Sequence, residues 1–300
     1  MRLGGPIFKK DVDPKTAVDI HRKLGFGAAF AGWIEDEAKR KEFVAAFEEA
    51  DITLAEYGSY CINILDTDPK VREENIQQIM TNLRRADEMK VRCCVIHGGS
   101  VQTGGWGAVN RENFSDKSFD DTIAIVQRII DEVKPSTTKL VMETESYLLP
   151  DSPQEYLRII KAVDREQFAV HLDPVNITSS PRRFYENGAF IKECFYVLGP
   201  WIVSCHAKDT NMVDHASVEI TETFVGDGAI DYDVYLKEIV KLEPNPTLMI
   251  EHLSEAQMKQ GLEFLFAKAE ALGIEFEKSS ERDPSILDGA SAEYFAPHLD

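Results

Sequence analysis

The last four apolar runs of the sequence each carry, toward their end, a residue type that binds metal ions. These residues are Glu143, Asp173, His206 and Glu251. An ionised carboxylate at the end of a buried strand is costly unless it is paired or bound to a cation, so the four together predict one shared divalent metal. Three carboxylates and one imidazole form an oxygen-rich donor set. This set favours Mn²⁺, with Mg²⁺ and Co²⁺ as alternatives, over a structural zinc site built on thiolates.

The same residues are suited to acid–base chemistry on a sugar. A carbonyl group polarised by a cation makes the neighbouring C–H more acidic, and a carboxylate can then remove that proton to form an enediolate. Glu143 and Glu251 lie toward the ends of the fifth and eighth apolar runs, so we expect them to act from opposite sides, one removing the proton and the other returning it. His97 lies near the end of the fourth run. It either protonates or orients a substrate oxygen, or is a core histidine bonded to backbone.

Neighbouring residues are candidates for substrate binding. Alternate side chains of a strand point to the same face, so residues two positions from a predicted ligand lie beside it. This rule selects Glu145, His171 and Lys208, the last for a substrate oxyanion or, alternatively, for a salt bridge. The glycine-rich segment 98–113 is long for a connection in a compact domain, and we predict a lid whose Trp106 stacks on a sugar, with simple packing as the alternative.

The elements that must position these residues alternate regularly along the chain. Eight short apolar runs rich in strand-forming residues are separated by stretches with helical periodicity. The runs cover 2–8, 28–33, 54–61, 93–98, 139–145, 168–175, 202–208 and 247–253. The helical stretches cover 14–24, 35–50, 69–90, 117–133, 152–163, 188–198, 231–242 and 254–272. This alternation predicts an α/β protein with a single (β/α)₈ TIM barrel, whose active site lies at the C-terminal ends of the strands. A doubly wound sheet is the competitor, but no G-x-G-x-x-G follows the first run.

No linker or repeat divides the chain before residue 275. We therefore predict a barrel domain over residues 1–274 and a C-terminal tail over 275–300. The tail is polar and loses the periodicity, so it is either disordered or an arm that packs on another subunit, and the second alternative predicts a homo-oligomer.

Composition restricts the partners. The 300 residues include 33 Lys and Arg against 52 Asp and Glu, a formal net charge of −19. Such a surface repels phosphate backbones and anionic lipids, so we expect neither nucleic acid nor membrane as a partner. Five cysteines without C-x-x-C spacing are typical of a reducing compartment. With no apolar signal-like or membrane-spanning stretch, we expect a cytoplasmic enzyme with a small-molecule substrate.

Five segments, in their order and spacing, resemble the xylose isomerase-like barrel superfamily, which includes sugar-phosphate isomerases, ketose 3-epimerases, inosose dehydratase and apurinic endonucleases. They are VMETE with Glu143, HLDPVN with Asp173, the H-x-K-D segment that begins at His206, GDGAID at 226–231, and MIEHL with Glu251. The resemblance covers about residues 1–272. It implies the Glu-Asp-His-Glu metal site and a proton-transfer role for the two glutamates.

Two positions depart from the ketose 3-epimerase pattern. Those enzymes typically have a substrate-contacting histidine three positions after the aspartate ligand and an arginine six after the histidine ligand. Here the positions hold Asn176, which we assign to substrate binding, and Met212. We expect a metal-dependent sugar isomerase or epimerase, with a dehydratase or lyase of an oxidised sugar, an inosose or 3-keto-glycoside, as the alternative. An apurinic-site endonuclease is disfavoured because the negative charge repels nucleic acid and because the sequence has only seven histidines. A non-catalytic binding protein is disfavoured because the predicted metal ligands are all present.

Overall fold

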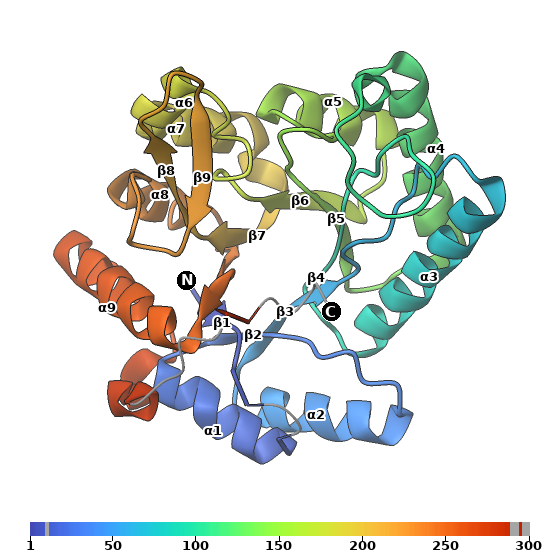
Figure 1. The fold of residues 1–300 in the computed structure, drawn as a ribbon. Coiled ribbons are helices and arrows are strands. Elements are labelled where there is room, and N and C mark those ends of the chain that lie inside the picture. Colours follow the sequence, from blue (N-terminus) through green and yellow to red (C-terminus); the bar gives the residue numbers. More distant parts are fainter. Residues whose placement is uncertain (10–11, 289–293, 296–300) are drawn as a thin grey trace.

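Eight short parallel strands form a closed barrel in the order β1-β10-β7-β6-β5-β4-β3-β2 (Figure 1). The computed structural model describes residues 1–9, 12–288 and the backbone of 294–295. The barrel strands are β1 (Leu3–Gly5), β2 (Ala28–Phe30), β3 (Thr53–Gly58), β4 (Cys93–Ile96), β5 (Lys139–Glu143), β6 (Phe168–Leu172), β7 (Ile202–Ala207) and β10 (Thr247–Ile250). The predicted (β/α)₈ TIM barrel is confirmed.

Helices surround the strands and begin at recognisable sequence signals. They are α1 (Pro14–Leu24), α2 (Glu37–Glu49), α3 (Pro69–Glu88), α4 (Asp116–Val133), α5 (Pro153–Val163), α6 (Pro181–Tyr185), α7 (Asn187–Leu198), α8 (Tyr232–Ile239) and α9 (Glu255–Leu272). Short 3₁₀ turns are η1 (Arg111–Phe114), η2 (Gly199–Trp201), η3 (Ser279–Glu281) and η4 (Pro284–Leu287). The side chains of Asp13 and Asp68 accept hydrogen bonds from the first backbone N–H groups of α1 and α3, each directly before a proline. Among the described residues, no helix combines the length and apolar character needed to cross a bilayer.

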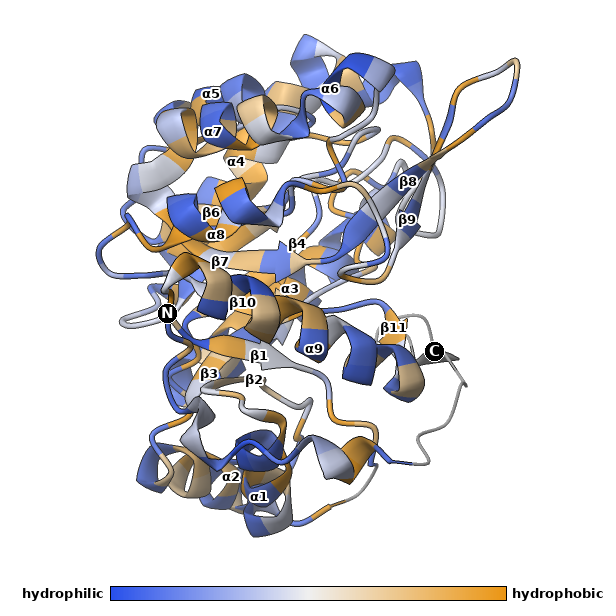
Figure 2. Ribbon diagram, turned by 90° about the vertical axis from the view of Figure 1, so that its left-hand side faces the viewer, coloured by the Kyte–Doolittle hydropathy of each residue, from blue (hydrophilic) through white to orange (hydrophobic). Residues whose placement is uncertain are grey.

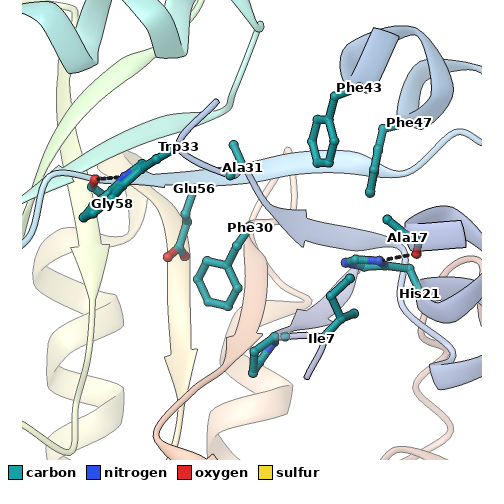
Figure 3. Close-up of a pocket in the computed structure, with 13 residues that line it drawn as sticks. Ile7, Ala17, His21, Phe30, Ala31, Trp33, Phe43, Phe47, Glu56 and Gly58 are labelled. Atoms are coloured by element: carbon teal, nitrogen blue, oxygen red, sulfur yellow. Dashed lines mark hydrogen bonds between the residues drawn. The ribbon is translucent and has the colours of Figure 1, made fainter. Parts of the chain in front are cut away.

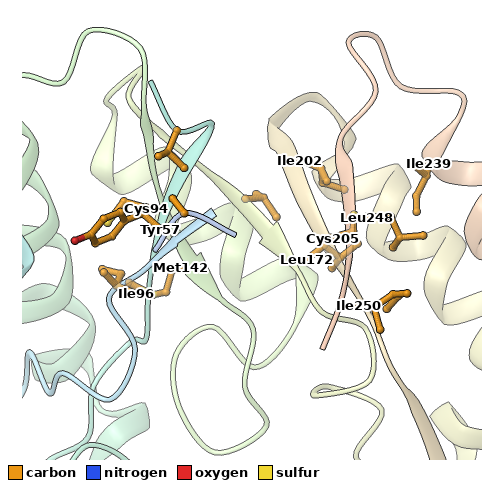
Figure 4. Close-up of a cluster of buried hydrophobic side chains, with 14 of the residues drawn as sticks. Tyr57, Cys94, Ile96, Met142, Leu172, Ile202, Cys205, Ile239, Leu248 and Ile250 are labelled. Carbon is orange, nitrogen blue, oxygen red and sulfur yellow. The ribbon is translucent and has the colours of Figure 1, made fainter. Parts of the chain in front are cut away.

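The two faces of the barrel strands have different neighbours. Outward-facing residues such as Ile96, Met142 and Leu172 pack in the main apolar core between strands and helices (Figure 4). Inward-facing Val95 and Val141 belong to a smaller apolar cluster inside the barrel. The strands are largely orange in Figure 2, whereas the surrounding helices alternate between hydrophilic and hydrophobic segments. Alternation along each strand therefore separates the packing face from the face that carries the polar residues.

Several structural features were not predicted from the sequence. Strands β8 (Asp209–Val213) and β9 (Glu219–Thr223) form an antiparallel hairpin directly after β7, which extends well beyond the barrel (Figure 2). The segment around β9 is rich in strand-forming residues and has Val218, Ile220 and Phe224 at even spacing, a signal that was missed. The β8 segment contains Asp209 and Asn211, residue types that are depleted in strands. The predicted apolar runs also extend past the ends of the strands. For example, β5 ends at Glu143, two residues before the end of the predicted run. Apolar composition does not show where hydrogen bonding between neighbouring strands stops.

The first part of the C-terminal tail contacts the barrel. Phe276 and Leu287 are buried, and η3 and η4 lie against α1, with η4 also against α9. Strand β12 (Tyr294–Phe295) pairs antiparallel with β11 (Leu253–Ser254). The remainder of the predicted tail, residues 289–293 and 296–300, lies outside the described residues, and the division at residue 274 stays a prediction.

Candidate active site

The four predicted metal ligands converge at the C-terminal ends of β5, β6, β7 and β10. Their ligand atoms all lie within 4.8 Å of one another, and all four side chains are buried. Nδ1 of His206 lies 2.8 Å from Glu251 Oε1, 3.1 Å from Glu143 Oε1 and 3.4 Å from Asp173 Oδ2. The structure thus brings together residues that are separated by up to 108 positions in the sequence. Metal binding by them stays a prediction.

The ammonium group of Lys208 lies among the same carboxylates. Its Nζ is 2.7 Å from Glu251 Oε1, 2.9 Å from Asp173 Oδ2 and 3.1 Å from Glu222 Oε2. Burial alone would lower the pKa of Lys208, but these three carboxylates raise it well above its ordinary value. Of the two roles considered from the sequence, the salt bridge is the one formed in this structure.

The ionisation of the cluster follows from its mixture of charges. Burial by itself would raise the pKa of Glu143 and of Glu251, but His206 and Lys208 hold both below the ordinary range. Burial would lower the pKa of His206, yet the neighbouring carboxylates raise it well above its ordinary value. Without a metal, the imidazole is therefore protonated on both nitrogens, and the two glutamates are ionised.

These residues fit a divalent cation. Asp173 Oδ2 and Glu251 Oε1 are buried and accept no well-oriented hydrogen bond, and their close neighbours are the cationic groups Lys208 Nζ and His206 Nδ1, at 2.7 to 3.4 Å. Three buried carboxylates exceed the two positive charges of Lys208 and protonated His206, and a buried excess of negative charge is costly. A cation at this position would take the place of the proton on His206 Nδ1, as metal binding to imidazole requires.

A cavity of about 280 Å³ opens above the cluster. Every predicted catalytic residue lines it, and so does every predicted substrate-binding residue except His171. The lining residues are Tyr60, Cys61, His97, Trp106, Glu143, Glu145, Tyr147, Asn176, Lys208, Glu222, Glu251 and His252. His171 is instead fully buried below the cluster, with its ring 4.0 Å from that of His206, so it does not reach the cavity.

Glu145 differs from the other carboxylates of the cavity in its ionisation. Burial and the neighbouring Glu143 raise the pKa of Glu145 to about 9, so this carboxyl is protonated at neutral pH. Asn176 Nδ2 donates to Glu143 Oε1 at 3.1 Å and to Glu145 Oε1 at 3.2 Å. Burial lowers the pKa of His97, whose Nδ1 lies 3.8 Å from Glu145 Oε1 and whose ring is 4.6 Å from that of Trp106. The cavity therefore contains both ionised carboxylates and a protonated one.

The sequence analysis missed several residues of this site, including Glu56, Glu222 and His252. Glu56 of β3 is fully buried and contacts His206. The sequence feature that could have identified it is a single carboxylate within an otherwise apolar strand. Glu222 was missed together with the hairpin that carries it. His252 follows Glu251 and its Nδ1 lies 2.8 Å from Glu222 Oε1, so its position depends on the same hairpin.

Comparison with known families agrees with this architecture. The family model described as xylose isomerase-like TIM barrel matches residues 18–268. The chain belongs to this family. Among the curated proteins, none matches the sequence of this xylose isomerase-like barrel.

Solved structures similar to this xylose isomerase-like barrel include several enzymes. A D-psicose 3-epimerase from Clostridium cellulolyticum H10, solved with D-tagatose, is 14% identical with a TM-score of 0.67, covering 91% of this chain and 99% of that one. The probable 3-DHS dehydratase AsbF from Bacillus anthracis is 15% identical with a TM-score of 0.65, covering 88% and 98%. Endonuclease IV from Thermus thermophilus is 14% identical with a TM-score of 0.69, covering 90% and 100%. At these identities the similarity shows a shared fold.

Proposed function

We propose that this protein is a divalent-metal-dependent sugar isomerase or epimerase that transfers a proton through an enediolate of a ketose or related keto-sugar. The observation that supports this proposal is that Glu143 and Glu251 belong to the buried cluster and also line the cavity. Two barrel strands, β6 and β7, separate the strands that carry them. The two ionised carboxylates therefore approach a bound substrate from different sides.

Glu143, Asp173, His206 and Glu251 would hold the metal, with Mn²⁺ as the proposed cation and Mg²⁺ or Co²⁺ as alternatives. When bound, a divalent cation would supply the positive charge that stabilises the negative oxygens of an enediolate. Lys208 adds positive charge beside Asp173 and Glu251 and keeps Glu251 ionised.

In the proposed reaction, one glutamate removes the proton from the carbon next to the substrate carbonyl. The other glutamate must first take up a proton from solvent and then delivers it, either to the opposite face of that carbon, which inverts it, or to the adjacent carbon. In the second case the carbonyl group moves, because a proton also passes from the hydroxyl oxygen to the former carbonyl oxygen. Asn176 orients Glu143 through the hydrogen bond from its Nδ2. Trp106 and Tyr147 form part of the cavity wall and would limit the access of water to the enediolate.

A dehydratase is the second candidate, and the ionisation of Glu145 favours it. Elimination of water needs an acid that protonates the departing hydroxyl group. Glu145 has a pKa of about 9 and lines the cavity beside Glu143, so a base and an acid lie next to each other. In this alternative, a glutamate removes the proton, Glu145 donates its own to the hydroxyl group, and water leaves.

A substrate panel in D₂O tests both candidates. Mn²⁺-loaded protein is incubated with ketoses, inososes and 3-keto-glycosides, and the products are analysed by NMR and mass spectrometry. An isomer that carries deuterium at the carbon next to the carbonyl supports proton transfer, whereas loss of one water supports the dehydratase. An isomer without deuterium indicates an internal hydride shift and would refute the proton-transfer mechanism. Conversion by metal-free protein at the same rate would refute metal dependence.

The cytoplasmic location and the homo-oligomer also stay predictions. Cell fractionation tests the first. Light scattering of the full chain and of a chain that ends at residue 288 tests whether the tail holds subunits together.

A further inference from the structure

Glu56 lies inside the barrel, below the cluster of predicted metal ligands and on a strand that supplies none of them. It belongs to β3, and its side chain has no exposed surface. It lies across the barrel from β7, where it contacts both Ser204 and His206. A fully buried carboxylate is strongly destabilising without partners, so the identity of these partners indicates what it does.

Both oxygens of Glu56 accept hydrogen bonds. Oε2 lies 3.2 Å from Nε2 of His206 and 3.3 Å from the hydroxyl group of Tyr60, and Oε1 accepts from the hydroxyl group of Ser204. The hydroxyl oxygen of Thr247, 2.9 Å from that of Ser204, extends the network. Because an ionised carboxylate can only accept, Nε2 of His206 must carry a hydrogen and donate it.

This hydrogen bond determines which nitrogen of His206 faces the cluster. Nδ1 is directed at the three carboxylates, at 2.8 to 3.4 Å. When Nε2 keeps its hydrogen, the lone pair that a metal needs is on Nδ1. The ring of His171 packs edge-on against that of His206 and leaves it little room to rotate.

We propose that Glu56 is a positioning residue that holds the Nε2–H tautomer and the ring orientation of His206, so that Nδ1 is presented to a divalent cation. This inference rests on the metal site of the proposed function. Glu56 would act on the metal only through His206, since it lies on the far side of the imidazole ring.

A second metal ion is the competing interpretation of the same residues, because Glu56, His171 and His206 also offer ligand atoms within 4.8 Å of one another. The hydrogen bonds argue against it. Nε2 of His206 cannot donate to Glu56 and bind a metal at once, and both oxygens of Glu56 already have donors. His171 Nδ1 lies 3.5 Å from Glu56 Oε1 and takes no part in a hydrogen bond.

A separate pocket ends against Glu56. It has a volume of about 310 Å³ and a mostly apolar lining that includes Phe30, Trp33 and Phe47, with Glu56 also on its wall. Figure 3 shows the carboxylate of Glu56 beside the ring of Phe30. A small carboxylate such as formate could enter by this route and replace the missing side chain of a Glu56→Ala variant.

The experiment measures Mn²⁺ binding to metal-free protein by calorimetry, and the tautomer of His206 by ¹⁵N NMR of the Mg²⁺-loaded protein. Loss of a hydrogen-bond partner behind a metal-binding histidine typically weakens metal affinity about 10- to 100-fold. We expect this decrease in Mn²⁺ affinity for Glu56→Ala. We expect it also for Glu56→Gln, which keeps the shape of the side chain. Formate should restore part of the affinity of Glu56→Ala. The Nε2–H signature of His206 should weaken or disappear in both variants.

Tyr60→Phe is the matched control, because it removes another donor to the same oxygen of Glu56 and leaves His206 in place. It should keep the affinity and the Nε2–H signature of the wild type. If Glu56→Ala or Glu56→Gln loses thermal stability but keeps both readouts, Glu56 is only structural and the inference is wrong. Two Mn²⁺ ions per wild-type chain would also overturn it.

These measurements need no substrate, so the two proposals can fail separately. Wild-type protein that binds no divalent cation would overturn both. Normal Mn²⁺ binding by wild type and Glu56→Ala alike would overturn only the role of Glu56. Normal binding with no conversion of any sugar would overturn only the proposed function.

Discussion

Replacing Lys208 with methionine removes a buried positive charge and keeps most of the side-chain volume. The ammonium lies within 3.1 Å of oxygens of Asp173, Glu222 and Glu251, and Asp173 and Glu251 are almost completely buried. Removing one partner of a buried ion pair typically costs about 3–5 kcal/mol, because the remaining charge is left without compensation. With about 2.1 cal/mol/K of unfolding entropy per residue, this loss lowers the melting temperature of a 300-residue chain by about 5–8 °C.

A divalent cation should reduce that loss. In the Lys208→Met protein, a metal held by the four predicted ligands restores positive charge to the same carboxylates. The stabilisation by Mn²⁺ relative to EDTA should therefore be larger in the variant than in the wild type. Differential scanning calorimetry of both proteins, in EDTA and in saturating Mn²⁺, measures this difference directly.

Lys259→Met is the control for this experiment. Lys259 pairs with Asp288 at 2.6 Å, but its side chain is 38% exposed, and exposed ion pairs contribute only about 0–1 kcal/mol. Its melting temperature should change little, with or without Mn²⁺. A Lys208→Met protein that melts at the wild-type temperature in EDTA would refute the reasoning about the uncompensated carboxylates. Equal stabilisation of both proteins by Mn²⁺ would refute the metal as their alternative partner.

Three further predictions concern the cavity. The pKa of Glu145 is about 9 in the folded protein against an ordinary 4.5, so its stabilising contribution is complete below about pH 4.5 and is lost as the pH rises through 9. The free energy of unfolding is measured with urea, in EDTA, between pH 5 and pH 8. As the pH rises, it should fall less for Glu145→Gln than for wild type, by up to about 1.4 kcal/mol per pH unit. The same pH dependence in both proteins would contradict the raised pKa of Glu145. Glu143→Gln and Glu251→Gln should each lower kcat at least about 10²- to 10⁴-fold while Mn²⁺ is still bound, measured with an active sugar from the panel, and undiminished turnover would remove that residue as a base. Trp106→Ala should have its main effect on substrate binding, seen as a raised KM, and a smaller effect on stability, seen as the melting temperature. An unchanged KM with a large fall in melting temperature would make Trp106 a packing residue.

The sequence by itself determined the barrel and the residues at the ends of four of its strands. The apolar runs and helical periodicities are local patterns. Their eightfold alternation, with no G-x-G-x-x-G after the first run, favoured a closed barrel over a doubly wound sheet. Glu143, Asp173, His206 and Glu251 could be placed together on sequence grounds alone, because the C-terminal ends of all barrel strands meet at one face.

Only the tertiary structure decided how the polar residues around this cluster are paired. Glu56 meets His206 because β3 and β7 face each other across the closed barrel, a relation that depends on strand register and has no periodic signal in the sequence. The ion pair of Lys208 with Glu222 exists because the hairpin β8–β9 brings Glu222 beside it. His171 has the same parity along β6 as Asp173, yet it lies one layer deeper and outside the cavity. Strand alternation determines the face to which a side chain points, but the depth and partners of that side chain depend on strands that are distant in the sequence.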